Sequence, residues 1–204
     1  MDNTSLKKHI AETAYNVGYS AKLHFATFEM AKKLPSRISI FTMLFATYAL
    51  TFSQFSTKFM SCTMLALGLI GLYISSKNKD MTDYEVKGIK LTDLFNELKH
   101  LMSEAEDPSA DSEDIKDKLK DIESRYNNSC ASDHIMFASW FAHYKFFWEQ
   151  QTEWIQAHRP FKFFRDQVPL TLWLTLFAVL VIAIFNFSAL TNLIFDYAKS
   201  KGYC

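Results

Sequence analysis

Turn-forming residues are scarce in this chain of 204 residues, which contains only 5 glycines and 4 prolines. A turn-rich β fold needs more of both, so the composition favours helices. The three cysteines, Cys62, Cys130 and Cys204, are odd in number and far apart. They exclude a disulfide framework and a cysteine-based zinc spacing. We therefore predict an all-α protein.

Motifs for catalysis and ligand binding are also missing. The sequence contains no GxGxxG, GxxxxGK[ST], GxSxG or HExxH, and its 6 histidines form no closely spaced pair. The acidic residues of segment 107–121 lack the central glycine and the bidentate glutamate of a calcium loop, so they are typical of a solvated helix face. We expect no enzyme activity, no metal site and no cofactor.

The net charge is zero, but the charges are segregated along the chain. Residues 80–133 hold 15 of the 22 acidic and 7 of the 22 basic residues, a net of −8, so the remainder has a net of +8. A basic remainder is compatible with nucleic acid or with anionic lipid. Because its charges lie beside apolar runs, we expect the lipid bilayer and no nucleic acid as partner.

Three long uncharged runs stand out. They are "ISIFTMLFATYALTFSQF" (38–55), "FMSCTMLALGLIGLYISS" (59–76) and "VPLTLWLTLFAVLVIAIFNFSALTNLIF" (168–195). At about 1.5 Å per residue, each nearly crosses or exceeds a hydrocarbon core of about 30 Å. The alternative is a buried helix of a soluble bundle, which usually keeps one polar face. We predict a transmembrane hairpin, with a tight turn near residues 56–58, and a third transmembrane helix.

Basic residues near the ends of these runs set the orientation. Eight fall on one side of a chain that crosses three times: Lys32, Lys33, Arg37, Lys77, Lys79, Arg159, Lys162 and Arg165. The other side holds only Lys58, Lys199 and Lys201. Since Lys and Arg accumulate in cytoplasmic loops, the N-terminus is expected to be cytoplasmic and the C-terminus outside.

These features divide the chain into six segments. They are a cytoplasmic helix (1–34) that continues into the first transmembrane helix with a bend near Pro35, the transmembrane hairpin (35–76), an acidic cytoplasmic helical hairpin (77–130), an aromatic and basic interfacial helix (131–167), the third transmembrane helix (168–195) and a short tail (196–204).

Two complementary apolar stripes indicate the acidic helical hairpin. The first consists of Leu91, Leu94, Leu98 and Leu101, at the spacing of a helix-packing seam, and the second of Ile115, Leu119, Ile122 and Tyr126. An acidic turn separates them, and Asp111 or Ser112 is a candidate cap for the second helix. The spacing is compatible with packing within one chain and with packing between chains.

The segment "HYKFFWEQQTEWIQAHRPFKFFRD" (143–166) mixes aromatic and basic residues densely. Such a mixture suits the headgroup layer, where rings meet acyl chains and cations reach phosphates. The candidate membrane-interface anchors are Trp140, Trp148, Trp154, Arg159, Lys162 and Arg165. We expect an amphipathic helix on the inner leaflet, broken at Pro160. In the alternative, the aromatic residues pack against the other cytoplasmic helices.

Polar residues inside the runs are candidates for a water-filled path. Thr47, Thr51 and Gln54 share one helix face, so they are the pore-lining candidates. The alternative is that they bond to backbone or across helices, at about 0.6 kcal/mol each. Gly68 and Gly71 allow helices to approach closely, although their spacing is one short of GxxxG.

The order of features resembles that of a known family. A helix and first run, "AYNVGYSAKLHFATFEMAKKLPSRISIFTMLFATYAL", enters a two-helix membrane hairpin that is followed by "YEVKGIKLTDLFNELKHL" and "IESRYNNS". This is similar to the SLATT family, the SMODS and SLOG-associating two-transmembrane effectors of bacterial conflict systems. The resemblance covers residues 6–129, and the aromatic segment and third run depart from the minimal family form.

The resemblance implies a pore-forming or membrane-disrupting effector in antiviral defence, located in the bacterial inner membrane. Such an effector forms a homo-oligomer through its cytoplasmic helices and acts in abortive infection when a separate nucleotide-synthesising or sensor protein signals. The alternative that the residues leave open is a non-catalytic membrane scaffold or sensor subunit, which docks a soluble partner through its acidic hairpin.

Overall fold

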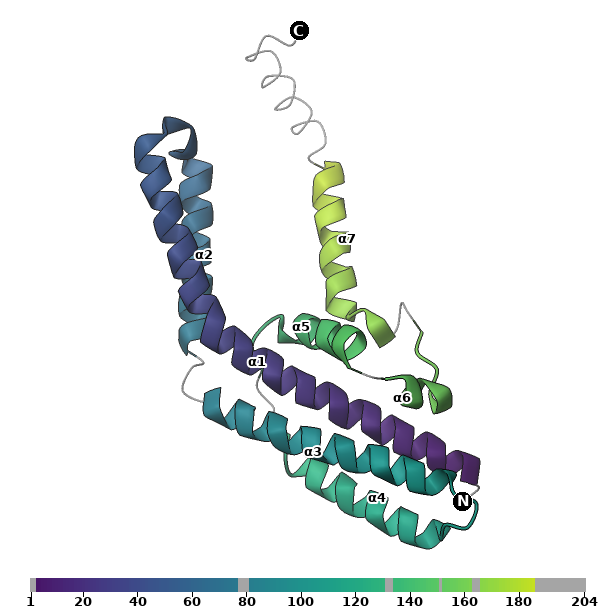
Figure 1. Ribbon diagram of the computed structural model, residues 1–204. Helices are drawn as coiled ribbons and strands as arrows, with labels where there is room; N and C mark the ends of the chain where they lie inside the picture. Colours follow the sequence, from purple (N-terminus) through teal and green to yellow (C-terminus); the bar gives the residue numbers. More distant parts are fainter. Residues whose placement is uncertain (1–2, 77–80, 131–133, 151, 163–165, 186–204) are drawn as a thin grey trace. The chain divides into compact units, whose positions relative to one another are not determined.

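The computed structural model describes residues 3–76, 81–130, 134–150, 152–162 and 166–185 (Figure 1). Within these ranges every regular element is helical, which confirms the all-α prediction. The elements are α1 (Asn3–Thr51), η1 (Ser53–Phe55), α2 (Lys58–Ser76), α3 (Met81–Glu106), α4 (Ser112–Asn127), α5 (Ala138–Tyr144), η3 (Lys145–Glu149), α6 (Glu153–His158) and α7 (Leu170–Phe185). The chain forms two units, residues 1–161 and 162–204.

Helix α1 is continuous over 49 residues and includes Pro35. Figure 1 shows the helix changing direction between its N-terminal part and the part that runs beside α2. Proline lacks the backbone N–H and its ring clashes with the preceding turn, which bends a helix. The N-terminal helix and the first apolar run therefore form one continuous, bent helix, as predicted.

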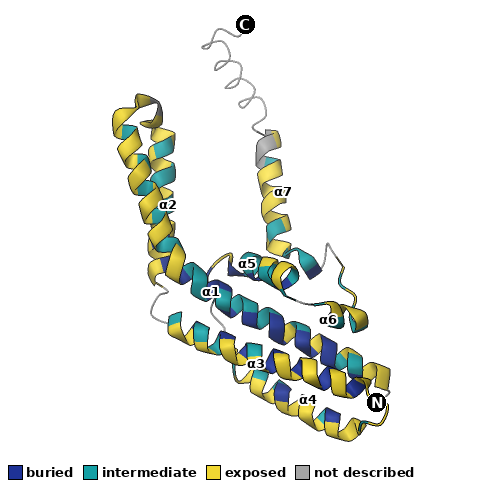
Figure 2. Ribbon diagram, in the orientation of Figure 1, coloured by how far each residue is buried: buried dark blue, intermediate teal, exposed yellow. Residues whose placement is uncertain are grey.

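A helical bundle forms the larger part of the first unit. Residues 3–34 of α1 pack against α3, α4, α5, η3 and α6, and the buried residues concentrate along this part of α1 and along α3 (Figure 2). The side chains of Leu6, Ile10 and Phe146 are at most 1% exposed. We call this assembly the helical bundle.

The leucine seam of α3 lies in the core of this bundle. Leu91 and Leu98 are fully buried, and Leu94 and Leu101 are 4% exposed. They belong to one apolar cluster with residues of α1 and with Ile122 of α4. The seam is thus filled within one chain, so a polar substitution in it acts first on folding and only indirectly on assembly.

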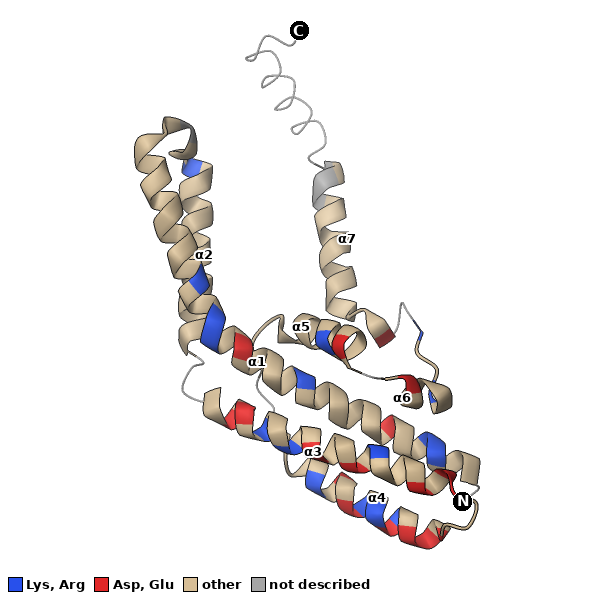
Figure 3. Cartoon of the chain, viewed as in Figure 1, with Lys and Arg blue, Asp and Glu red and all other residues tan. Residues whose placement is uncertain are grey.

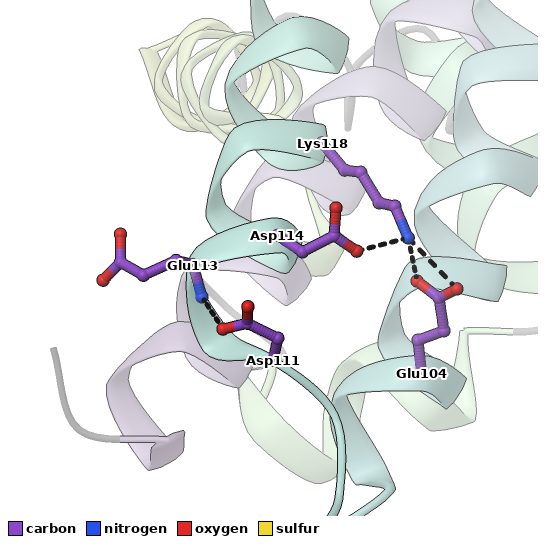
Figure 4. Close-up of polar contacts among 5 residues, drawn as sticks. All are labelled: Glu104, Asp111, Glu113, Asp114 and Lys118. Atoms are coloured by element: carbon purple, nitrogen blue, oxygen red, sulfur yellow. Dashed lines mark hydrogen bonds and ion pairs between the residues drawn. The ribbon is translucent and has the colours of Figure 1, made fainter.

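Helix α4 begins with a side-chain cap. The Oδ1 atom of Asp111 accepts a hydrogen bond from the backbone N–H of Glu113 at 2.9 Å (Figure 4). This satisfies one of the free amides at the helix start. Lys118 joins α4 to α3 through Glu104 at 3.1 Å and also contacts Asp114 at 2.8 Å. These pairs are exposed to solvent, so they add little to the stability of the bundle.

The aromatic segment is not one helix, which corrects the sequence-based expectation. Helix α5 and the wider turn η3 end at Glu149, and α6 covers only Glu153–His158. Arg159 is extended, with φ −136°, as expected for the residue before Pro160. The predicted break at Pro160 is present, but the earlier one near residue 150 has no proline or glycine to indicate it.

The second unit contains α7, which has 16 described residues and is about 24 Å long. The rest of the predicted third run, residues 186–195, and the tail 196–204 lie outside the described residues, as does Arg165. Near the start of this unit the backbone N–H of Lys162 donates a hydrogen bond to Oδ2 of Asp166 at 2.9 Å.

Gly18 marks the closest approach of helices inside the bundle. A Cβ atom at this position would lie 2.7 Å from the ring of Phe95 and 2.9 Å from that of Phe146, and both rings are buried. We expect Gly18→Ala to lower the free energy of unfolding by about 1 kcal/mol or more, because overpacking costs about 1–3 kcal/mol and exceeds the gain in helix propensity.

Thermal unfolding in a mild detergent, followed by far-UV circular dichroism, measures this effect. Gly68→Ala is the matched control, since a Cβ atom there meets no described atom within 4 Å. Equal melting temperatures for the two variants would contradict the packing described for Gly18.

Candidate functional site: the apolar hairpin and its base

Residues 38–51 of α1, η1 and α2 form an antiparallel pair of helices, which we call the apolar hairpin (Figure 1). The turn spans residues 52–57 and includes η1. The two helices come close at Gly71, where a Cβ atom would lie 3.4 Å from Ile38, whereas Gly68 faces open space. One of the two glycines thus serves helix packing.

The apolar hairpin exposes large apolar side chains around most of its surface (Figure 2). The most exposed are Met43 (68%), Leu50 (90%), Phe59 (75%), Leu65 (67%) and Leu72 (69%). Figure 3 shows almost no charge along its length. Exposed apolar surface of this extent marks a membrane or protein contact, so the hairpin surface needs a lipid or protein cover.

Several threonine and serine hydroxyl groups of the hairpin donate to backbone carbonyls three or four residues earlier in the chain. Thr42 donates to the carbonyl of Ile38 at 3.0 Å, and Thr63 donates to that of Phe59 at 3.0 Å. Ser61 does the same. A hydroxyl bonded in this way has a satisfied donor, so its exposure to lipid carries little energetic cost.

The pore-lining candidates share this arrangement. Thr47 and Thr51 are exposed, and their hydroxyls donate to the carbonyls of Met43 at 3.0 Å and of Thr47 at 3.4 Å. Gln54 belongs to η1, and its side chain lies outside what the structure describes. Exposure of two of the three on one helix permits a water-lined face but does not test it, so pore lining stays a prediction.

Only α2 meets the length and composition of a membrane span among the described residues. It has 19 residues and is about 28 Å long. Of its most apolar stretch, 11% is buried within the protein. The uncharged part of α1 ends at Thr51, which leaves about 21 Å between Arg37 and the turn. Leu170–Val181 of α7 is apolar but shorter. The three-crossing topology is therefore a proposal.

The model of the family described as SMODS and SLOG-associating 2TM effector domain 6 matches residues 1–176. The chain belongs to the SLATT family. This confirms the resemblance seen in the sequence and extends it, because the match includes the aromatic segment up to the first part of α7. No curated protein and no solved structure matches the chain.

Membership of the SLATT family associates the chain with the membrane and makes it an effector domain of conflict systems. The family description specifies two transmembrane helices, and among the described residues α2 has the length and composition of one. Because the aromatic segment falls within the match, it is part of the SLATT domain and not an addition to it.

The predicted interface anchors of the SLATT domain divide into two groups. Trp148 is 81% exposed, and Trp140 is partly exposed. Trp154 packs instead against Phe95 of the core, with ring centroids 5.6 Å apart. The guanidinium of Arg159 lies 3.8 Å from the ring centroid of Tyr15. Trp154 and Arg159 therefore follow the alternative of packing against the other helices.

An ion-pair network joins α5 and η3 to α1. The carboxylate of Glu29 accepts hydrogen bonds from Lys145 and from Lys33, the latter at 3.4 Å. Burial by itself would raise the pKa of Glu29, but the hydrogen bond and charge of Lys145, with those of Lys33, lower it. The hydroxyl of Tyr19 in α1 also lies 3.0 Å from Nδ1 of His143 in α5.

A wide cleft of about 940 Å³ lies between α3 and α4. Its acidic lining comprises Glu97, Glu104, Asp107, Asp117 and Asp121, and its basic lining comprises Lys118 and Arg125. The described residues contain no group of three His, Cys, Asp or Glu side chains arranged to hold a metal ion. The cleft offers negative charge to a partner, and part of that charge is paired with Lys118 and Arg125.

Two histidines of the bundle, the buried His24 and the half-buried His143, have lowered pKa values. His24 is 1% exposed, and its Nδ1 lies 2.7 Å from the carbonyl of Ser20. Burial lowers the pKa of His24, and burial likewise lowers the pKa of His143. Sequence analysis did not single out these histidines, because a lone histidine on a helix gives no signal of burial.

The sign of the effect follows from the lowered pKa values. As pH falls through about 6.5, histidines of the unfolded chain take up protons before those of the folded chain do, so stability falls. We expect the melting temperature to be constant above about pH 7.5 and to drop between about pH 6.5 and 5. His143→Gln should make this drop shallower.

Thermal unfolding at a series of pH values tests the expectation, and replacement of the exposed His100 by Gln is the control. A melting temperature that rises on acidification, or an equal slope for wild type and His143→Gln, contradicts it.

Proposed function

We propose that this SLATT domain is a membrane effector that oligomerises and opens a pore or otherwise disrupts the bacterial inner membrane when a separate sensor or nucleotide signal activates it. It acts in antiviral defence by abortive infection, and it has no catalytic activity of its own. The N-terminus and the bundle lie in the cytoplasm, the chain crosses the membrane three times, and the C-terminus is outside.

One observation carries the proposal: the continuous helix α1 belongs to the packed bundle and to the exposed apolar hairpin. A rigid helix transmits a rotation or shift of its packed half to its other half. A partner or a second copy that moves the bundle would therefore reorient the hairpin in the bilayer. Exposed faces such as those with Leu50 and Leu65 then provide the surface for contacts between hairpins.

Induced clustering in liposomes tests this proposal. A domain that dimerises on addition of a small molecule is fused before the N-terminus of the full chain, and the protein is reconstituted in vesicles that contain a fluorescent dye. We expect dye release only after the small molecule is added, and release should rise more steeply than in proportion to protein density. Release by the fusion domain alone, or none from inserted and clustered protein, contradicts the proposal.

The cleft between α3 and α4 favours a second candidate function, a non-catalytic scaffold or sensor subunit. Its acidic lining suits a basic soluble partner. Reversal of charge at Asp114, Asp117 and Asp121 should then remove a partner that co-purifies with the wild type, while dye release stays absent in both proteins. If clustering releases the dye, the pore-forming function is supported and the scaffold function is not.

A further inference from the structure

Two adjoining cavities open where the apolar hairpin meets the bundle. One has a volume of about 450 Å³ and the other of about 440 Å³, within the range of small-molecule sites. Met30, Leu34 and Phe137 line both, so the cavities share a wall.

The first cavity is apolar. It is bounded by Ile38 of α1, by Leu69, Ile70 and Ile74 of α2, and by Met136 before α5. Only the hydroxyl of Tyr73 interrupts this lining with a polar side-chain group. Since α2 is the candidate span, the proposed insertion of the hairpin would bring acyl chains to this cavity. Its chemistry suits an acyl chain and excludes a charged ligand.

The second cavity is basic and aromatic. Glu29, Lys33 and Arg37 follow one another at intervals of four residues along α1, so they share a face, and Trp140 of α5 lies across from them. The charge of Glu29 is matched by Lys145. Arg37 is exposed and forms no ion pair with any residue that the structure describes. The cavity therefore offers net positive charge, which is complementary to a phosphate.

Phe137 stands between the two cavities in a left-handed backbone conformation, with φ 67°. A bulky residue costs about 1–3 kcal/mol in this region and is found there mainly at functional sites. Phe137 is 51% exposed, and the centroid of its ring lies 4.7 Å from the ring centroid of Trp140. The strained residue presents an aromatic ring at the shared wall, between the apolar and the basic cavity.

From this juxtaposition we infer that one phospholipid with an anionic headgroup binds at the base of the hairpin. Lys33 and Arg37 hold the headgroup phosphate, and an acyl chain enters the groove lined by Leu69 and Ile70. The inference rests on the proposed membrane insertion of the hairpin. It adds a specific ligand that bridges α1, α2 and α5, so that binding ties the hairpin to the aromatic segment.

Native mass spectrometry of the full chain, released from detergent with added lipid, tests the site. Phosphatidylglycerol, phosphatidylcholine and inorganic phosphate are the three probes. We expect a 1:1 complex with phosphatidylglycerol, with affinity at least about tenfold higher than for phosphatidylcholine. Phosphate alone should neither bind detectably nor displace the lipid.

Paired variants separate this site from general attraction to lipid. Lys33→Gln with Arg37→Gln should weaken phosphatidylglycerol binding about tenfold or more, whereas Lys7→Gln with Lys8→Gln, an equal change of charge on the same helix, should not. Ile70→Trp should fill the groove and weaken binding, whereas Leu72→Trp, on an exposed position outside the lining, should not. If the Lys33/Arg37 variant does not fold, the comparison of Ile70→Trp with Leu72→Trp still tests the site.

Membrane integration is measured separately, by resistance of the chain to alkaline extraction. An integrated chain that binds both lipids equally, or whose Lys33/Arg37 and Lys7/Lys8 variants bind alike, overturns the lipid site and leaves the proposed function standing. Displacement of the lipid by phosphate also overturns it. A chain that is extracted from the membrane overturns the proposed function itself.

Discussion

Leu65→Arg is expected to remove most of the chain from the membrane and to abolish dye release on clustering. Leu65 lies near the middle of α2 and is 67% exposed, so the bundle does not shelter it. An arginine at the centre of a spanning helix costs about 2.5–3.5 kcal/mol of insertion free energy. This is enough to reduce the equilibrium constant for insertion by about a hundredfold.

The measurement is the fraction of protein that resists alkaline extraction from membranes. Ser76→Arg is the matched control, since it adds the same charge at the exposed end of α2, where the side chain reaches the headgroup layer. If both variants stay fully inserted, α2 is not a membrane span and the hairpin must be covered by protein.

Phe146→Ala should have the largest effect on the stability of the bundle. The side chain is 0% exposed and contacts the ring of Tyr15 edge-on at 5.4 Å and that of Phe147 at 5.1 Å. Truncation of a buried phenylalanine costs about 3–5 kcal/mol, through lost burial and the cavity that remains. We expect most of a marginal stability to be lost, and α5 to detach from α1.

Thermal unfolding in detergent measures the loss, and limited proteolysis between α5 and α6 shows the detachment. Trp148→Ala, two residues further along η3, is the control, because its side chain is 81% exposed and its removal should change stability by less than about 0.5 kcal/mol. Similar losses for the two variants would contradict the packing of this segment.

Periodicity was sufficient to predict helices α3 and α4 and the faces on which they pack. Leu91 and Leu98 recur at helical spacing and are fully buried, and Asp111 caps α4. What periodicity does not contain is the partner of each face. The sequence therefore did not show whether the leucine seam packs within one chain or between chains. In the structure it packs against α1 of the same chain.

The aromatic segment was the least predictable region for a physical reason. Aromatic rings suit a protein core and a membrane interface equally well, so the sequence does not separate Trp154, which packs on Phe95, from Trp148, which is exposed. The left-handed backbone of Phe137 also gave no signal, because such conformations usually coincide with glycine or asparagine. The lipid site depends on Phe137 and on Trp140, whose ring lies beside it.

The most direct test of the account is the sidedness of two single cysteines. Cys130 is exposed at the end of the bundle and is the single cysteine once Cys62 and Cys204 are replaced by serine. In a second variant all three native cysteines are replaced by serine, and Ser56→Cys places the single thiol in the turn of the hairpin. In intact spheroplasts, an impermeant maleimide should label Ser56→Cys and leave Cys130 unlabelled until the membrane is permeabilised. Labelling of both thiols from the same side would mean that the hairpin does not cross the bilayer.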